Sequence, residues 1–166
     1  MDIANIISFI PILFYGFGFI NLINKIYIQE QYKETSIYFY GLIISTFSAQ
    51  ALKYLVPYPK WFHKYSMRPK GASNCDYLSS CGPVPENTSG FPSGHMSTTS
   101  YFIVYNILYI FKNNYNKLLI LPNIILLILM GWARIKKLCH NLIQVISGTC
   151  LGSLIAYIFF YIIKLN

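Results

Sequence analysis

The sequence has little charge, and very little of that charge is negative. Only 11% of its 166 residues are charged, and five acidic residues stand against 13 basic residues. An ordinary soluble domain has about 25% charged residues, so this composition excludes a disordered chain or a coiled coil and fits a soluble globule poorly. The four cysteines are too few for a disulfide-dense secreted mini-protein.

Apolar residues are correspondingly abundant. They make up 55% of the chain, and the mean hydropathy is +0.46. A bilayer is crossed by about 20 apolar residues, and runs of roughly that kind cover residues 5–24, 37–56, 91–111, 118–132 and 141–163. The start, Met1-Asp2, lacks the positive region of a signal peptide, so we expect the first run to be retained. The sequence predicts an all-α fold: a polytopic membrane helix bundle with about five transmembrane helices.

The polar segments between these runs fall into a pattern. Residues 57–90 read as a long loop, and residues 134–140 form a short basic segment. Counting crossings places both segments and the N-terminus on the same side of the membrane. The basic residues are scattered over such segments rather than forming a stripe on one helix. We therefore expect contact with membrane lipids or an anionic substrate, no nucleic acid, and no obligate protein partner.

Two of the three histidines, His95 and His140, lie at span boundaries on this shared side. His95 follows Ser93-Gly94 at the start of the third span, where free backbone N–H groups and the helix dipole favour an anion. His140 and Gln144 are four residues apart, so they share a helix face and the amide can orient the imidazole ring.

Arginines accompany both histidines. Arg68 lies in the long loop and Arg134 precedes His140, so two arginines and a lysine can hold three oxyanion oxygens. One imidazole can attack phosphorus while the other protonates the leaving group. No Cys/His cluster has metal-ligand spacing. The pattern favours phosphoryl transfer through a phosphohistidine, with no metal and no cofactor.

These residues resemble the membrane branch of the type-2 phosphatidic acid phosphatases, which are related to vanadium haloperoxidases. That family has three motifs: Lys-x6-Arg-Pro, Pro-Ser-x-His and Ser-Arg-x5-His-x3-Asp. Here the first survives as Arg68-Pro69, the second is complete as Pro92-Ser93-Gly94-His95, and the third reads Ala133-Arg134-x5-His140-x3-Gln144. The resemblance covers about residues 53–152, the motif-bearing core of what we expect to be a single membrane-embedded domain, residues 1–166.

The resemblance implies a role for each motif residue. His140 would be the nucleophile and His95 the general acid, while Arg68, Arg134, a lysine, Ser93 and Gly94 would bind phosphate. The sequence departs from the family at the motif lysine, because the required position is Trp61. Lys53, at the end of the second span, is our preferred candidate over Lys60 and Lys64.

Two further departures lie in the third motif. Ala133 replaces serine, which removes one phosphate contact. Gln144 replaces aspartate, as in the dolichyl-diphosphatase and glucose-6-phosphatase branches, and we expect it to orient His140. The implied function is a hydrolase, a metal-independent phosphatase of a phospholipid or polyprenyl (di)phosphate. Two other function classes stay open: a phosphate-head-group binder without catalysis, and a small channel or transporter subunit.

The remaining signals concern compartment and packing. A disulfide between Cys75 and Cys81 and a glycosylation sequon at 87–89 would suit a lumenal or exoplasmic site, in the endoplasmic reticulum or another endomembrane. Cys139 and Cys150 are expected to be reduced and buried. The hydroxyl groups of residues 97–100 are expected to bond their own helix. Gly148 and Gly152 predict a closely packed fifth span.

Overall fold

The computed structural model describes residues 3–27, 33–55, 58–75, 82–85 and 88–164. These residues form α-helices, short 3₁₀ helices and isolated β-bridges. The elements in chain order are α1 (Ile3–Ser8), α2 (Ile10–Tyr27), α3 (Lys33–Leu55), η1 (Lys60–Phe62), α4 (His63–Ser66), α5 (Gly94–Lys112), η2 (Lys117–Leu119), α6 (Ile120–Lys136) and α7 (Leu142–Lys164). The all-helical prediction is confirmed for the described part of the chain.

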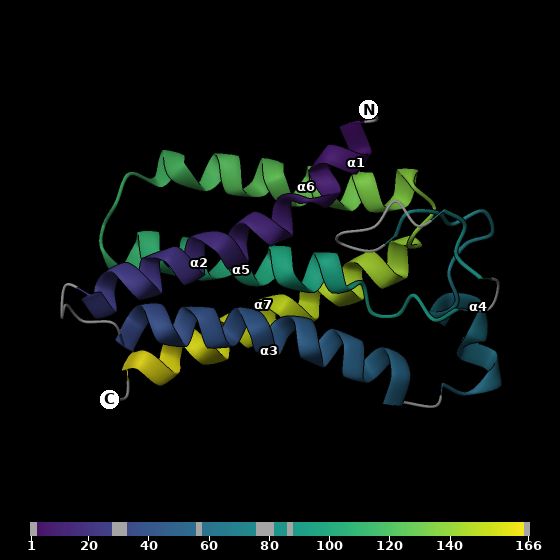
Figure 1. Ribbon diagram of the computed structural model, residues 1–166, viewed down its shortest axis with the longest axis horizontal. Helices are drawn as coiled ribbons and strands as arrows, with labels where there is room; N and C mark the ends of the chain where they lie inside the picture. The colour runs from purple at the N-terminus through teal and green to yellow at the C-terminus, as the bar shows by residue number, and fades with distance from the viewer. Residues whose placement is uncertain (1–2, 28–32, 56–57, 76–81, 86–87, 165–166) are drawn as a thin grey trace.

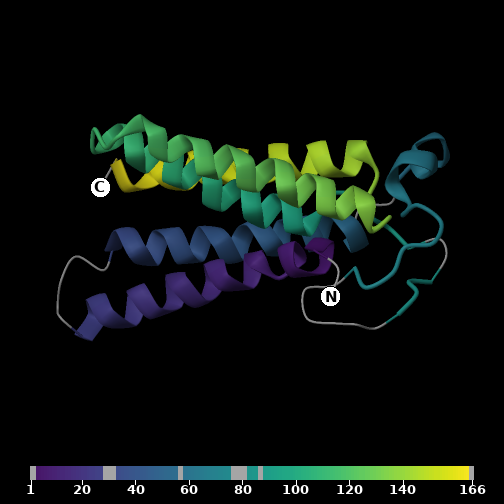
Figure 2. The ribbon, with the colours of Figure 1, turned by 90° about the horizontal axis from the view of Figure 1, so that it is seen from above.

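The long helices run side by side along the molecule (Figure 1). Helix α5 lies at the centre, where it packs against α3, α6 and α7. Helix α2 lies against α3, and α1 lies against α6 near the N-terminus (Figure 2). Figure 1 shows that α1, the loop after α3 and the connection from α6 to α7 meet at one end of the bundle. This is the end at which the predicted motifs lie.

Three helical stretches of the described chain are long and apolar enough to cross a membrane: Ile3–Asn24, Lys117–Lys136 and Leu142–Ile162. Helices α3 and α5 are also long, with 23 and 19 residues, but they are less apolar. The reason is visible in the packing, because both helices turn polar side chains toward the interior of the bundle. Apolarity alone therefore supports three spans, and the predicted count of about five is not reached on this criterion.

The polar side chains of α3 and α5 bond to each other. The Ser45 and Ser97 hydroxyls lie 2.8 Å apart, and those of Thr46 and Thr98 lie 2.7 Å apart. The Ser100 hydroxyl donates to the Thr149 carbonyl of α7. The expectation that these hydroxyls bond their own helix is confirmed for Thr98, whose hydroxyl lies 3.1 Å from the Gly94 carbonyl, and for Ser100, whose hydroxyl lies 3.2 Å from the Ser97 carbonyl. Burial between helices gives both of them interhelical partners as well.

The glycines of α7 allow close contact with α5. A Cβ atom at Gly148 would collide with the Ser93 carbonyl, and one at Gly152 would collide with the Ser97 carbonyl. The predicted packing of this helix is therefore present. It also fixes the first turns of α5 against α7, and those turns carry His95.

Two differences from the predicted element boundaries bear on the site. Helix α6 continues to Lys136, so Arg134 belongs to its last turn rather than to a polar segment. The segment 57–90 contains the short elements η1 and α4 and two isolated bridges, Met67 with Ser89 and Ser73 with Pro83. The loop is thus folded back on itself beside the ends of α3 and α7.

Candidate active site

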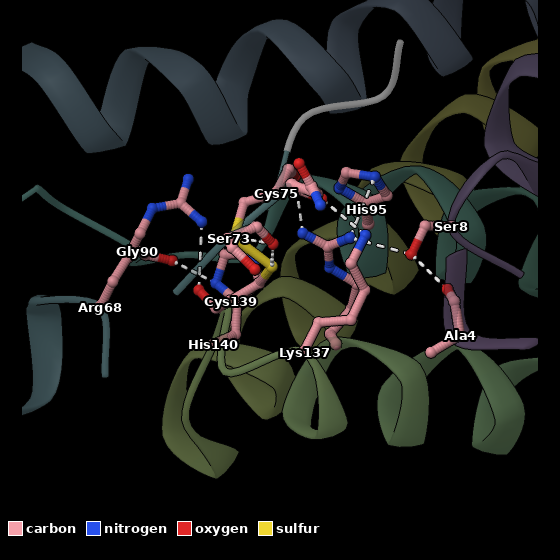
Figure 3. Close-up of a disulfide and its surroundings, with 12 residues drawn as sticks. Ala4, Ser8, Arg68, Ser73, Cys75, Gly90, His95, Lys137, Cys139 and His140 are labelled. Atoms are coloured by element: carbon pink, nitrogen blue, oxygen red, sulfur yellow. Dashed lines mark hydrogen bonds between the residues drawn. A yellow bond between two sulfur atoms is a disulfide. The ribbon is translucent and has the colours of Figure 1, made fainter. Parts of the chain in front are cut away.

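His140 lies in the short connection between α6 and α7, just before α7 begins. Its Nδ1 atom is 2.9 Å from the Gly90 carbonyl oxygen (Figure 3) and 3.2 Å from Gln144 Oε1. A carbonyl oxygen only accepts, so Nδ1 must carry the proton and donate to Gly90. The other ring nitrogen, Nε2, then keeps its lone pair, which is what a nucleophile requires.

Gln144 holds this arrangement with every polar atom of its side chain. Its Nε2 donates to the Tyr65 and Met67 carbonyls, at 2.8 Å each. Its Oε1 accepts from the Asn141 backbone N–H at 3.2 Å and faces His140 Nδ1. Two carbonyl acceptors on one side fix which way the amide points. Gln144 therefore joins the long loop to α7 and orients His140, although His140 lies outside the helix that was expected to carry both.

Arg134 is fully buried and makes contacts to three other segments. Its Nη1 donates to the Ser8 hydroxyl at 3.1 Å and lies 3.5 Å from His95 Nε2. Its Nη2 donates to the Cys75 carbonyl at 2.6 Å. Helix α6 thus presents a guanidinium group directly beside the imidazole of His95, in the first turn of α5.

Arg68 reaches the site from the opposite side, out of the long loop. Its backbone N–H donates to the Thr88 carbonyl, and its Nη1 donates to the Cys139 carbonyl at 3.1 Å. The carbonyl that Arg68 contacts belongs to the residue directly before His140 (Figure 3). Arg68 therefore contacts the connection that leads from Arg134 to His140.

Lys53 comes from the last turn of α3 and is only 8% exposed. Its ammonium group lies 3.4 Å from Gln50 Oε1, one turn earlier on the same helix. Lys60 and Lys64, the other candidates for the motif lysine, are exposed. The structure places Lys53, and neither of these loop lysines, beside the histidines.

A small cavity lies where these segments meet, lined by Gln50, Lys53, Arg68, Cys75, Gly94, His95 and His140. Ser93, buried directly before α5, donates its backbone N–H to the Gln144 carbonyl. This contact ties the start of α5 to α7. Gly94 then lines the cavity at the first turn of α5, where helix N–H groups favour an anion.

The charge of the cavity is positive. Burial, and then the nearby guanidinium groups of Arg134 and Arg68, lower the pKa of His140 well below its ordinary value. The imidazole of His140 is therefore neutral at pH 7. Lys53 and Arg68 line the cavity, and none of the described residues that line it carries a carboxylate. An anion with several oxygens would balance this charge.

Sequence reasoning missed Ser8 and Gln50. No signal in the sequence points to Ser8, since it lies in an apolar run far from any motif. Gln50 precedes Lys53 by three residues, which places both on one helix face, and this spacing could have identified it.

The cysteine expectations need correction. Cys75 is bonded to Cys139, with Cα atoms 5.4 Å apart, so Cys139 is buried but not reduced. Cys81, its expected partner, lies outside the described residues, as does Asn87 of the sequon. Cys150 is a free thiol but is exposed rather than buried, because it lies on the outer face of α7.

Comparisons with known proteins bear on the same region. A family model described as the PAP2 superfamily matches residues 34–166. This range contains all the residues that line the cavity and excludes Ser8. No curated protein and no solved structure matches the chain.

Proposed function

Because the chain belongs to the PAP2 superfamily, whose members are phosphatases and haloperoxidases, we propose that it is a metal-independent membrane phosphatase that hydrolyses a lipid phosphate or diphosphate monoester. One observation carries the proposal: the Nδ1–H of His140 is bonded to the Gly90 carbonyl, while the ring lines a cationic cavity beside His95. A neutral imidazole with a free Nε2 lone pair beside anion-binding groups suits attack on phosphorus.

The reaction proceeds in two steps. Nε2 of His140 attacks phosphorus, the bond from phosphorus to the leaving oxygen breaks, and His95 gives that oxygen a proton. Water then attacks the phosphohistidine while His95 takes one of its protons, which releases phosphate and restores His140. Lys53, Arg68, Arg134 and the backbone at Ser93–Gly94 hold the phosphoryl oxygens, and Gln144 keeps the ring of His140 in place.

His95 must carry a proton in the first step. Its Nε2 lies 3.5 Å from a guanidinium nitrogen of Arg134, and a positive imidazole would be repelled there. A bound phosphate monoester brings up to two negative charges. These charges offset the neighbouring cations and favour protonation of His95.

We further propose that residues 1–166 form a single membrane-embedded domain that crosses the membrane five times. The disulfide from Cys75 to Cys139 keeps the long loop and the α6–α7 connection on one side. Since α6 crosses between them, α5 must cross as well. The bond from Arg134 to Ser8 keeps the N-terminal helix on that side too, so α2 and α3 form a pair of crossings.

The proposed substrate class rests on the position of the cavity and on the identity of Gln144. The cavity lies at the ends of long helices, within reach of a lipid head group, and Gln144 matches the branch that includes dolichyl diphosphatases. Our first choice is therefore a polyprenyl diphosphate, with phosphatidate second. A disulfide beside the cavity supports a lumenal or exoplasmic site, in the endoplasmic reticulum or another endomembrane.

The test measures phosphate release by the purified protein in detergent with excess chelator. Phosphatidate, a polyprenyl diphosphate and glucose 6-phosphate are offered to the wild type, to His140→Ala and to His63→Ala. His63 is an exposed histidine of α4 and serves as the matched control. We expect release that survives chelation, falls by a factor of about 1,000 or more in His140→Ala, and is unchanged in His63→Ala.

Release that disappears with chelator, or that persists in His140→Ala, contradicts the proposal. Folded protein that binds phosphate and releases none from any substrate supports the alternative, a binder without catalysis. The missing motif lysine was one reason for that alternative, and the burial of Lys53 at the cavity weakens it.

A further inference from the structure

The disulfide between Cys75 and Cys139 lies inside the candidate site. Cys75 comes from the long loop, Cys139 directly precedes His140, and the two are 64 residues apart in the chain. Both are buried, and Cys75 lines the cavity itself. Figure 3 shows the bridge from Cys75 to Cys139, directly beside His140.

Each bridged cysteine also holds one arginine through its backbone carbonyl, in a crossed arrangement. The Cys75 carbonyl accepts from Arg134 Nη2 at 2.6 Å, and the Cys139 carbonyl accepts from Arg68 Nη1 at 3.1 Å. Arg68 belongs to the same loop as Cys75, and Arg134 belongs to the same α6–α7 segment as Cys139. Each hydrogen bond therefore spans the same gap as the covalent bridge.

We propose that the Cys75–Cys139 disulfide is a positioning device that sets Arg68 and Arg134 at the distance needed to bind one phosphoryl group. The proposal rests on the proposed function, since it assigns the two arginines to phosphate. It adds a requirement: the phosphate site is complete only while the bridge is oxidised.

Electrostatic repulsion is the first reason that a covalent link is needed. Lys53, Arg68 and Arg134 all act on His140 as nearby positive charges. Before a phosphate arrives, like charges on the loop and on α6 repel each other and favour separation of the two segments. The bridge opposes this separation without adding any charge.

The small apolar contact around the bridge is the second reason. Ala72, Cys75 and Cys139 form a buried cluster of their own, with Val84 packed against it. Among the described residues, this cluster of four is a small core with which to hold this part of the loop against its conformational entropy. A disulfide supplies the constraint where a core is too small to do so.

The chemistry of opening the bridge is simple. A dithiol reductant converts the disulfide to two thiols and is itself oxidised to a cyclic disulfide, so atoms and electrons balance. The carbonyls of Cys75 and Cys139 remain, but the segments that carry them are free to separate. Each arginine then loses its fixed position, and phosphate affinity falls.

The first experiment maps the bridge and measures binding without turnover. Peptides from the non-reduced protein are expected to contain Cys75 joined to Cys139. Inorganic phosphate is titrated into wild type, Cys75→Ser/Cys139→Ser and Cys150→Ser, the last being a control because Cys150 is a free thiol outside the bridge. We expect phosphate affinity to fall about tenfold in the double variant, as loss of charged hydrogen-bond geometry implies, and to be unchanged in Cys150→Ser.

Reduction of folded wild type with dithiothreitol covers the case in which the double variant does not fold. We expect the same loss of phosphate affinity, unchanged helix content, and recovery on reoxidation. Equal affinity before and after reduction, a peptide that joins Cys75 to Cys81, or folded protein that binds no phosphate would each overturn the proposal.

A double-variant cycle separates positioning from general support of the fold. If the bridge acts through the arginines, its loss must cost less affinity when Arg68→Ala is already present. Fully additive losses would contradict the positioning role. The proposed function fails differently: bridge-dependent phosphate binding without release from any substrate contradicts hydrolysis and leaves the positioning role standing.

Discussion

At the scale of single residues, Gln144 shows why an amide suits this site. Its Nε2 donates to two loop carbonyls, Tyr65 and Met67, while its Oε1 faces the imidazole of His140. A carboxylate at this position would only accept and would leave both carbonyls without their donor. The departure from the family's aspartate therefore suits the loop, which presents two carbonyl acceptors that an amide can bond and a carboxylate cannot.

Ser8 supplies a residue-scale prediction. Its hydroxyl accepts from Arg134 Nη1 and donates to the Ala4 carbonyl, and it is almost fully buried. Ser8→Ala removes one partner of a buried guanidinium, a loss of about 1–2 kcal/mol. We expect phosphate affinity and the rate of hydrolysis to fall roughly five- to thirtyfold. Ser8→Thr keeps the hydroxyl and is expected to stay close to wild type.

Ser153→Ala, in the middle of α7, is the matched control and should change neither phosphate affinity nor the rate of hydrolysis. Equal phosphate affinity in Ser8→Ala and wild type would show that Arg134 keeps its position without the N-terminal helix.

The lowered pKa of His140 predicts how stability depends on pH. Its folded pKa lies below the value near 6.5 of the unfolded chain, so its contribution to stability is present above about pH 6.5. That contribution is lost as pH falls through 6.5 toward the folded pKa, by up to about 1.4 kcal/mol per pH unit. Thermal unfolding in detergent between pH 7.5 and 5.0 measures it.

His140→Asn, which keeps a donor for Gly90 but does not titrate, should show a shallower loss of stability with falling pH. His63→Asn, at an exposed site, should follow the wild type. A wild-type profile that is flat below pH 6.5 would contradict the burial of a neutral His140.

At the scale of elements, the contact between α5 and α7 positions the site. Gly152 lies against the Ser97 carbonyl and the Ser100 hydroxyl, and Gly148 lies against Ser93. The first turn of α5, which carries His95, is thereby held against α7, which follows His140. A side chain at either glycine must push the two helices apart.

Gly152→Ala tests this contact. We expect it to destabilise the protein by about 1–3 kcal/mol, as overpacking of a tight contact does, and to reduce hydrolysis because α5 shifts. Gly16→Ala is the control, since a Cβ there meets nothing within 4 Å and alanine favours a helix. Thermal midpoints in detergent should fall for Gly152→Ala and stay level or rise for Gly16→Ala; equal midpoints would contradict the packing argument.

At the scale of the whole molecule, two contacts support the five crossings that we propose. Arg134 with Ser8 and Cys75 with Cys139 join the N-terminal helix, the long loop and the α6–α7 connection at one end of the bundle (Figure 1). Helices α3 and α5, at about 1.5 Å per residue, are long enough to cross about 30 Å of hydrocarbon. Their polar side chains face each other rather than lipid.

The five proposed crossings predict from which side of the membrane an impermeant reagent can label each loop. Single cysteines at Lys70 and Lys136 should react on one side of sealed vesicles, and one at Asn114 should react only on the other. All three variants would be made in a Cys81→Ser/Cys150→Ser background, so that the introduced cysteine is the one thiol outside the bridge. Labelling of Asn114 and Lys136 on the same side would contradict five crossings and would leave only the three most apolar helices as spans.

Hydropathy and motif spacing were enough to predict the long helices, to place the motifs at the ends of these helices, and to name the residue types of the site. Hydropathy and helix periodicity are local properties, and motif residues such as His95 and His140 flank apolar runs that can be read directly. The tertiary structure alone decided which lysine lines the cavity, that Cys75 pairs with Cys139, and that Ser8 touches Arg134. Each of these contacts joins residues that are far apart in the chain, 64 positions for the disulfide and 126 for Ser8 with Arg134. Such contacts depend on how the helices pack side by side, which local sequence patterns do not show.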